Sequence, residues 1–269
     1  MGTIILYLER QILLSIVTCQ FFSYTYAINR NQKGAVFMCS EFYTKDEVMT
    51  VLNDHNVMHL YHANTVKTAC SFLAHKGLFS RQEMEVRGYP QTAQKSDRID
   101  MKYGIYNDIF FDSCDIHKRA HNANKYGPVL FVFSNKVVYE AYHIAITRKN
   151  PIYWENSYQI NENEHYFINI EDLKEEFHYG DFGQSITFHN QEQVSFNTLQ
   201  GIVLDCLPDD LLKQKNFKQK WDSAYCRLKY FVKQLDKQVP LTLRSCDELC
   251  QCSDFYRNKH LEIDKFFDI

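Results

Sequence analysis

The sequence predicts an α+β protein, with strands concentrated in the middle of the chain and helices toward its end. Residues 128–133 form the clearest strand signal, because this short run is almost wholly apolar and rich in Val and Phe. Residues 209 to about 237 form the clearest helix signal, because their apolar positions recur at the spacing of one helix face. No internal repeat is visible.

The first part of this core is predicted as a helix, a strand and a second helix. A short helix over 43–53 opens with residue types typical of a capping box. A strand over 56–62 and a helix over 65–76 follow it. Gly77 then stands where a helix commonly ends with a residue in the left-handed conformation.

The remainder of the middle region is less regular. Residues 81–124 are polar and predict no element, and a loop of this length is either functional or conceals an element. The elements expected after the strand at 128–133 are a strand or short helix over 137–147, strands over 152–158 and 166–170, a helix over 170–177, and strands over 185–188, 193–196 and 199–204.

Composition limits the classes of protein to consider. The chain has 269 residues, of which 45% are hydrophobic and 23% charged, so it can bury a core and is not extensively disordered. With 30 Lys and Arg against 33 Asp and Glu, the formal net charge of −3 excludes a uniformly basic coat for nucleic acid.

The charge of one segment differs from this nearly neutral balance. Residues 213–237 contain eight basic and two acidic residues. They predict either a solvated helix face or a nucleic-acid-binding stripe. The candidate contacts are Lys213, Lys218, Lys220, Arg227 and Lys229.

The first forty residues and the cysteines give conflicting signals about compartment. Residues 12–27 resemble the apolar part of a signal peptide, but Glu9 and Arg10 interrupt the apolar residues just before them. The polar residues within the uncharged stretch make it a poor membrane span. Nine dispersed cysteines, an odd number, favour a reducing compartment. We expect a cytoplasmic protein without stable membrane association, with secretion through residues 1–27 as the alternative. Residues 1–40 are set apart from the domain.

The most informative segment is 60–81. His62 ends a predicted strand, a helix follows at once, and Gly77 and Leu78 end that helix. This pattern resembles the opening motif of the ADP-ribosyltransferase superfamily, especially the DarT-type toxins that modify nucleic acids. The resemblance implies a split mixed β-sheet core over 41–210. The helical spacing and basic charge that follow predict a basic helical extension with a Cys-rich tail over 211–269. It also implies that His62 holds the ribose and nicotinamide of NAD, with Asn64 and Gly77 in the same NAD site.

Two later segments extend the resemblance. Residues 125–134 look like the family's middle strand, where an aromatic side chain stacks on nicotinamide, and Tyr126 is the candidate. Residues 188–204 look like the late segment in which a glutamate precedes a strand, a turn and a strand, and Glu192 is that residue. Arg81, at the end of the first motif, is expected to bind the NAD pyrophosphate or an acceptor phosphate.

This reading predicts a specific chemistry. Cleavage of the bond between nicotinamide and ribose builds oxocarbenium character, so a carboxylate must lie near the developing cation or its 2′-hydroxyl. Glu192 would supply it, and we expect His62 and Glu192 to line one cleft. NAD would be a substrate, no metal would be needed, and the acceptor would be DNA or RNA. The resemblance further implies a toxin or phage-defence effector with an inhibitory antitoxin protein as partner.

Other interpretations remain open from the residues alone. A non-catalytic nucleic-acid-binding protein could act through the basic segment, and an ADP-ribosyltransferase could act on protein. The acidic part of the polar region could bind divalent ions for a two-metal nuclease. Its candidate ligands are Asp97, Asp100, Asp108, Asp112, Asp115 and His117. A tail zinc site could use Cys246, Cys250, Cys252 and His260, although their spacing is not that of common zinc modules.

Overall fold

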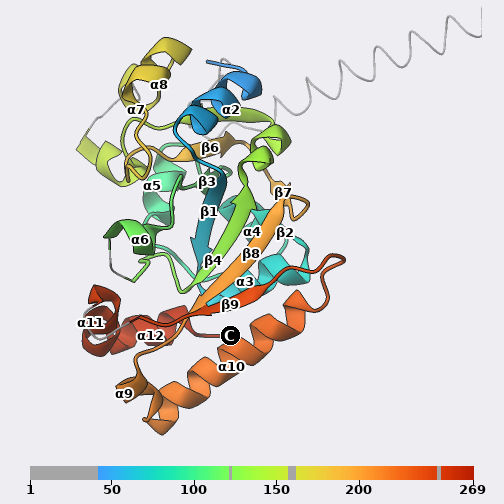
Figure 1. Ribbon diagram of the computed structural model, residues 1–269, viewed down its shortest axis with the longest axis vertical. Helices are drawn as coiled ribbons and strands as arrows, with labels where there is room; N and C mark the ends of the chain where they lie inside the picture. The colour runs from blue at the N-terminus through green and yellow to red at the C-terminus, as the bar shows by residue number, and fades with distance from the viewer. Residues whose placement is uncertain (1–41, 121–122, 157–161, 247–249) are drawn as a thin grey trace, which may run out of the picture. The chain divides into compact units, whose positions relative to one another are not determined.

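The computed structural model describes residues 42–120, 123–156, 162–246 and 250–269, which belong to one compact unit. These residues fold as an α+β protein with separate sheets, which confirms the predicted fold class (Figure 1). The main sheet has the strand order β1–β4–β8–β9, in which β1, β4 and β8 pair antiparallel and β9 lies parallel to β8. Its strands are β1 (His59–Asn64), β4 (Val129–Ser134), β8 (Leu199–Asp205) and β9 (Leu241–Arg244).

Two smaller sheets complete the strand arrangement in the described residues. Both are antiparallel, with the orders β2–β7 and β3–β6–β5. A two-way backbone bridge between Tyr61 and Asp112, with N···O distances of 3.0 and 2.9 Å, joins the edge of the main sheet to the segment after β3. The strands are β2 (Gly77–Phe79), β3 (Ile109–Phe111), β5 (His143–Ile146), β6 (Ile186–His189) and β7 (Gln193–Ser195).

The helices surround these sheets (Figure 1). The polar region without a predicted element contains α4, α5, β3 and α6. The α-helices are α2 (Lys45–Asp54), α3 (Val66–Ala74), α4 (Arg81–Val86), α5 (Asp97–Lys102), α6 (Ile116–Ala120), α7 (Glu162–His165), α8 (Ile170–Glu176), α9 (Asp209–Leu212), α10 (Lys215–Val232), α11 (Gln251–Asn258) and α12 (His260–Phe266). The 3₁₀ helices are η1 (Asn135–Glu140) and η2 (Pro151–Asn156).

The helix boundaries confirm the predicted capping box and correct the role predicted for Gly77. Thr44 caps α2 and forms the full capping box with Glu47, as predicted. Gly77 does not end α3 in the left-handed conformation, because Lys76 takes it with φ of 56°. Gly77 lies instead in β2, where an added Cβ would come within 2.5 Å of the Gln193 side chain. The glycine therefore permits β2 to approach β7 closely.

Three other element predictions were wrong or incomplete. Residues 152–158 were predicted as a strand, but the described part is the 3₁₀ helix η2, whose Ile152 amide donates to the Asn150 side chain at 3.1 Å. Residues 166–170 form only an isolated bridge at Tyr166. The helix expected over 209–237 is two helices, which end at Leu212 and Val232.

The C-terminal region shares the core rather than extending from it. The strand β9 adds to the main sheet, and α10 packs on α3 and buries Phe217, Ala224 and Leu228. Tyr256 and Phe267 of the tail are fully buried in the same apolar cluster. Residues 211–269 were predicted as helical, and the strand was missed.

Among the described residues, no helix combines the length and apolar character that crossing a bilayer requires. The predicted apolar segment over 1–40 lies outside the described residues.

Candidate active site

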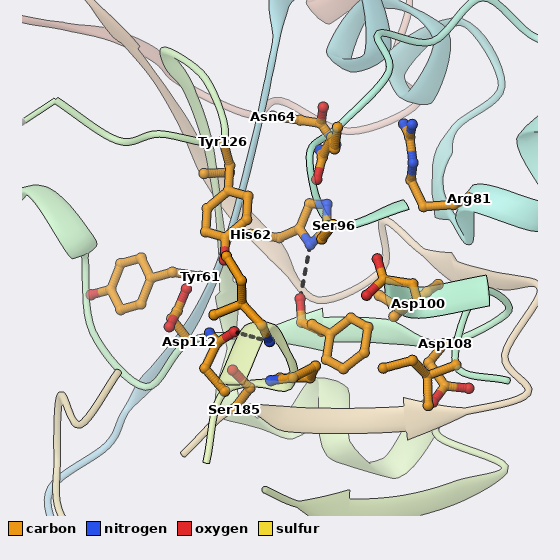
Figure 2. Close-up of a pocket in the computed structure, with 18 of the residues that line it drawn as sticks. Tyr61, His62, Asn64, Arg81, Ser96, Asp100, Asp108, Asp112, Tyr126 and Ser185 are labelled. Carbon is orange, nitrogen blue, oxygen red and sulfur yellow. Dashed lines mark hydrogen bonds between the residues drawn. The ribbon is translucent and has the colours of Figure 1, made fainter. Parts of the chain in front are cut away.

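A cleft lies between β1 and the polar region formed by residues 81–124 (Figure 2). Its walls come from β1, the start of α4, α5, β3 and the segments around residues 126 and 150–152. The space among the lining residues is about 900 Å³, part of it open to solvent. Polar side chains from several segments converge on this space together with apolar ones, which is typical of small-molecule and cofactor sites in proteins.

His62, predicted from its place at the end of β1, lines this cleft. Its Nδ1 lies 2.9 Å from the main-chain oxygen of Phe110, which can only accept, so Nδ1 carries the proton. Burial lowers the pKa of His62, and the Arg81 guanidinium lowers it further. The ring is therefore neutral at pH 7, and its buried Nε2 has no hydrogen-bond partner.

Arg81 reaches the same cleft from the first turn of α4. Two of its nitrogens, Nε and Nη2, bind the Asp97 carboxylate at 3.0 and 2.8 Å. The third nitrogen, Nη1, is buried without a partner. Because buried donors are almost always hydrogen-bonded in proteins, this atom marks a place where a ligand acceptor is expected. Asp97 orients the guanidinium without filling its last donor position.

Asn64 and Tyr126, two residues predicted for an NAD site, line the cleft on the side of β1 (Figure 2). Asn64 is only 2% exposed, and its Oδ1 accepts the Thr65 amide at 2.9 Å. Gly127 has φ of 142°, and an added Cβ would lie 2.3 Å from the Asn64 backbone. Only glycine allows the turn that carries Tyr126 to approach β1 this closely.

Three aspartates from the polar region also line the cleft. Burial raises the pKa of Asp100 to about 7, with the Asp97 and Asp108 carboxylates adding to the effect. Burial likewise raises the pKa of Asp112 to about 6, although Arg119 opposes the shift. Carboxylates with raised pKa values in a cleft are typical of groups that accept or donate protons in catalysis.

Asp108 has a different role from the other two. It accepts from His189 Nδ1 at 2.6 Å and from the Asn190 amide at 2.9 Å, and its side chain is almost completely buried. These contacts connect the cleft wall to the end of β6. Asp108 therefore holds β3 and β6 together beside the site.

Two predicted site residues do not line the cleft. Gly77 lies in the β2–β7 sheet. Glu192 was expected opposite His62, but its side chain is exposed and is not among the lining residues. The cause is local, because the neighbouring Gln191 turns inward to bind the Tyr142 amide at 2.9 Å and the Gln193 carbonyl at 2.6 Å. The Glu192 carbonyl accepts the Ser80 amide at 3.0 Å, which places its main chain next to Arg81.

The basic residues of the C-terminal helices lie outside the cleft lining. Several are paired with acids: Lys218 binds Asp222 at 2.6 Å, and Lys220 binds Asp264 at 2.7 Å. Lys213, Arg227 and Lys229 are exposed. The positive stripe is therefore a solvated surface, part of whose charge is neutralised locally.

The acidic residues proposed for a nuclease do not gather into one metal site in the described part of the chain. Asp97 pairs with Arg81, Asp108 with His189, and Asp115 with Arg244 at 2.6 Å. The one group with metal-binding proximity among described residues is His117, Cys246, Cys250 and Cys252. His117 thus takes the place predicted for His260.

Sequence reasoning missed the role of the polar region in the cleft. Ser96, Asp100, Asp108 and Asp112 were either left unassigned or read as metal ligands, yet all four line the site with His62. A usable signal was present, because aspartates interleaved with aromatic residues are typical of a half-buried polar wall. The bridge that brings Asp112 beside Tyr61 could not be read from sequence.

Fold and site together define an α+β protein with a cleft, lined by both polar and apolar side chains, at the edge of its main sheet. Comparison with known proteins adds structural similarity to DarT from Thermus sp. 2.9, at 11% sequence identity and covering 70% of this chain and 95% of that chain. The TM-scores are 0.43 for its complex with ADP-ribosylated ssDNA, 0.41 for the complex with NAD+ and 0.39 for the complex with carba-NAD+. No known sequence family and no curated protein matches the chain.

Proposed function

We propose that this protein is an NAD-dependent ADP-ribosyltransferase that modifies nucleic acid. The observation that carries the proposal is a pair of buried polar atoms without partners, His62 Nε2 and Arg81 Nη1, on residues lining one cleft. One is an acceptor and the other a cationic donor. A dinucleotide offers the complement to both, because its ribose hydroxyls donate and its pyrophosphate accepts.

We assign a part of NAD to each group that lines the cleft. His62 accepts a hydrogen bond from a ribose hydroxyl through Nε2, and Arg81 donates to the pyrophosphate through Nη1 while Asp97 holds its other side. Tyr126 supplies the aromatic surface against which nicotinamide packs. Asn64 supplies an amide for the nicotinamide carboxamide or the ribose. These assignments agree with the motif resemblance of residues 60–81.

The reaction breaks the nicotinamide–ribose bond and joins the anomeric carbon to an acceptor atom, which loses a proton. Asp112 and Asp100 are suited to take that proton, since their raised pKa values of about 6 and about 7 match the operating pH of a general base. Glu192, exposed next to the main chain of Ser80, remains our candidate for stabilising the ribosyl cation. Released nicotinamide leaves by the open side of the cleft.

The proposed acceptor is a base of single-stranded DNA or RNA. The exposed Lys213, Arg227 and Lys229 would hold its phosphates electrostatically, outside the cleft. An enzyme that modifies nucleic acid harms its own cell, so we also propose a toxin or defence role with an inhibitory antitoxin partner.

The test uses NAD labelled in its adenylate part, incubated with the protein and with DNA, RNA or cell lysate. Label transferred to nucleic acid, with release of nicotinamide, supports the proposal. His62→Ala and Glu192→Gln variants with unchanged circular dichroism are expected to lose the transfer.

Other outcomes of the same experiment identify the alternatives. Strand cleavage that requires Mg²⁺ and not NAD would indicate a nuclease. Retention of nucleic acid without reaction would indicate a binding module. Label on protein alone would keep the transferase chemistry and overturn the proposed acceptor.

A further inference from the structure

Four potential metal ligands lie close together where α6 meets the segment between β9 and α11. None of them lines the cleft. His117 lies in α6, Cys246 follows β9, Cys250 precedes α11, and Cys252 is in the first turn of α11. In sequence, His117 is separated from the cysteines by about half of the chain. The fold nevertheless brings one ligand atom from each residue within 4.8 Å of all the others.

The distances fit a tetrahedral centre. His117 Nε2 lies 3.3 Å from the Cys246 sulfur and 3.8 Å from the Cys250 sulfur. Zinc binds thiolate sulfur at about 2.3 Å and imidazole nitrogen at about 2.0–2.1 Å, so ligand atoms at the corners of a tetrahedron lie about 3.5–3.8 Å apart. A single ion at the centre therefore reaches all four atoms after small side-chain adjustments.

We propose that His117, Cys246, Cys250 and Cys252 bind one Zn²⁺ in a Cys₃His site that fastens the C-terminal segment to α6. Three soft thiolates and one imidazole select zinc over the hard cations that prefer oxygen. Four protein ligands leave no open position for water or substrate, so the ion is structural. Binding releases the thiol protons to solvent, because the thiolate is the ligand.

Polar contacts beside the cluster already connect the segments that the proposed ion would join. Arg244, two residues before Cys246, binds Asp115 at 2.6 Å and Asp205 at 2.6 Å. Asp205 also accepts from the Tyr256 hydroxyl at 3.3 Å. These polar contacts tie the end of β9 and α11 to the segment before α6, and the zinc site adds a second connection between the same pieces. Asp112, which lines the cleft, belongs to the segment held in this way.

A disulfide does not explain the cluster as well. A disulfide would use two sulfurs and leave both the third cysteine and His117 without a role. None of the described cysteines forms a disulfide. A metal uses all four groups at once, which is the reason to prefer it.

The test measures zinc directly in the full chain, purified under reducing conditions without chelators. Inductively coupled plasma mass spectrometry is expected to find one zinc per chain in the wild type. Cys252→Ser and His117→Ala are expected to reduce zinc at least tenfold. The matched controls are His260→Ala and Cys226→Ser, which change a histidine and an exposed cysteine outside the cluster and are expected to keep full zinc.

A second measurement covers variants that fail to fold. Co²⁺ added to metal-free wild type is expected to give the thiolate charge-transfer absorption and the intense visible bands of tetrahedral coordination, both reversed by Zn²⁺. Thermal unfolding of the wild type is expected to shift to lower temperature on chelation.

Three results would overturn the zinc site. They are wild-type protein without zinc and without a cobalt spectrum, zinc lost in His260→Ala but retained in His117→Ala, and a disulfide among the three cysteines by mass spectrometry. None of these readouts depends on NAD or nucleic acid, so the site and the proposed function can fail separately.

Discussion

The residues of the cleft and those of the helix α10 were both predicted as functional from the sequence. Their polar groups differ in burial and in hydrogen-bond partners. In the cleft, Arg81 and His62 each keep a buried polar atom without a partner. On α10, Lys218 forms an ion pair with an acid one turn along the helix, and its side chain is 59% exposed. The first arrangement costs free energy unless a ligand compensates it, whereas the second is stable by itself.

This contrast shows which polar residues are informative. A run of surface cations indicates at most an electrostatic preference, because water and local acids satisfy it. A buried donor without a partner, on a residue that lines a cleft, favours a ligand there, because few buried polar groups in proteins remain without a hydrogen bond. Changes to the cleft should therefore alter activity or stability strongly, and changes to α10 should alter them weakly.

The largest effect is expected for Arg81→Ala. Loss of a preorganised cationic donor typically lowers kcat by a factor of about 10²–10³, and we expect a loss of this size in transfer of label from NAD. The matched control is Arg87→Ala, which removes an arginine at the C-terminal end of α4 that pairs with Glu83 and does not line the cleft. This control should retain activity within about twofold. Equal losses in both variants would show that α4 acts only through its stability.

Gly127→Ala should produce the next largest effect. Its left-handed conformation costs about 1–2 kcal/mol for a residue with a Cβ, and the overlap with the Asn64 backbone adds about 1–3 kcal/mol. We expect the free energy of unfolding in urea to fall by about 3 kcal/mol. Gly88→Ala is the control, because Gly88 also has positive φ but open space around it, and it should lose only about 1 kcal/mol. Similar losses at both positions would contradict the close approach.

Asp100→Asn should change stability in the opposite direction. The pKa of Asp100 is about 7 in the folded state against a model-peptide value of 3.8, so the folded state binds the proton more strongly. Its contribution to stability is complete below pH 3.8 and is lost as pH rises through 7. The full shift corresponds to about 4 kcal/mol at pH 8, and desolvation of the new amide offsets part of it.

The Asp100→Asn variant should therefore be about 2 kcal/mol more stable than wild type at pH 8, with little difference at pH 4. Urea unfolding at the two pH values measures the change. Asp97→Asn provides the contrast, since it removes the partner of Arg81 and should destabilise the protein at pH 8. A wild-type stability independent of pH between these values would refute the raised pKa.

The smallest effect is expected on α10. A variant with Arg227→Gln and Lys229→Gln loses two exposed cations. Binding of a single-stranded oligonucleotide should weaken by less than about tenfold, and the dependence of log Kd on log salt should become shallower by about one to two. NAD binding should not change. A stronger effect than that of Arg81→Ala on transfer would reverse the contrast between the two regions.

Local signals in the sequence predicted much of the fold. The capping box at Thr44, the strand at 128–133 and the late strands follow from residue types a few positions apart, and the structure confirms them. The errors arose where tertiary contacts determine the secondary structure. Residues 152–156 have strand-like composition, but hydrogen bonds to Asn150 turn them into a 3₁₀ helix. β9 was missed because its half-exposed residues carry little pattern.

The residues that line the cleft were also predicted only in part, because local patterns in the sequence do not report tertiary contacts. His62, Asn64, Arg81 and Tyr126 lie in or next to recognisable elements, and all four line the cleft. Glu192 was expected in the cleft lining but lies outside it, because the side chain of the neighbouring Gln191 turns inward instead. Asp112 and the partnership of His117 with the cysteines depend on contacts between segments far apart in the chain. Spacing along the sequence carries no information about such pairs.

The most direct test of the proposed site is calorimetric titration of NAD into the full chain, compared between wild type, His62→Ala and Arg81→Ala. We predict one binding site per chain in the wild type and at least tenfold weaker binding in each variant, with unchanged circular dichroism. Absence of binding to the wild type at millimolar NAD, or the same affinity in all three proteins, would contradict the proposal that this cleft holds a dinucleotide.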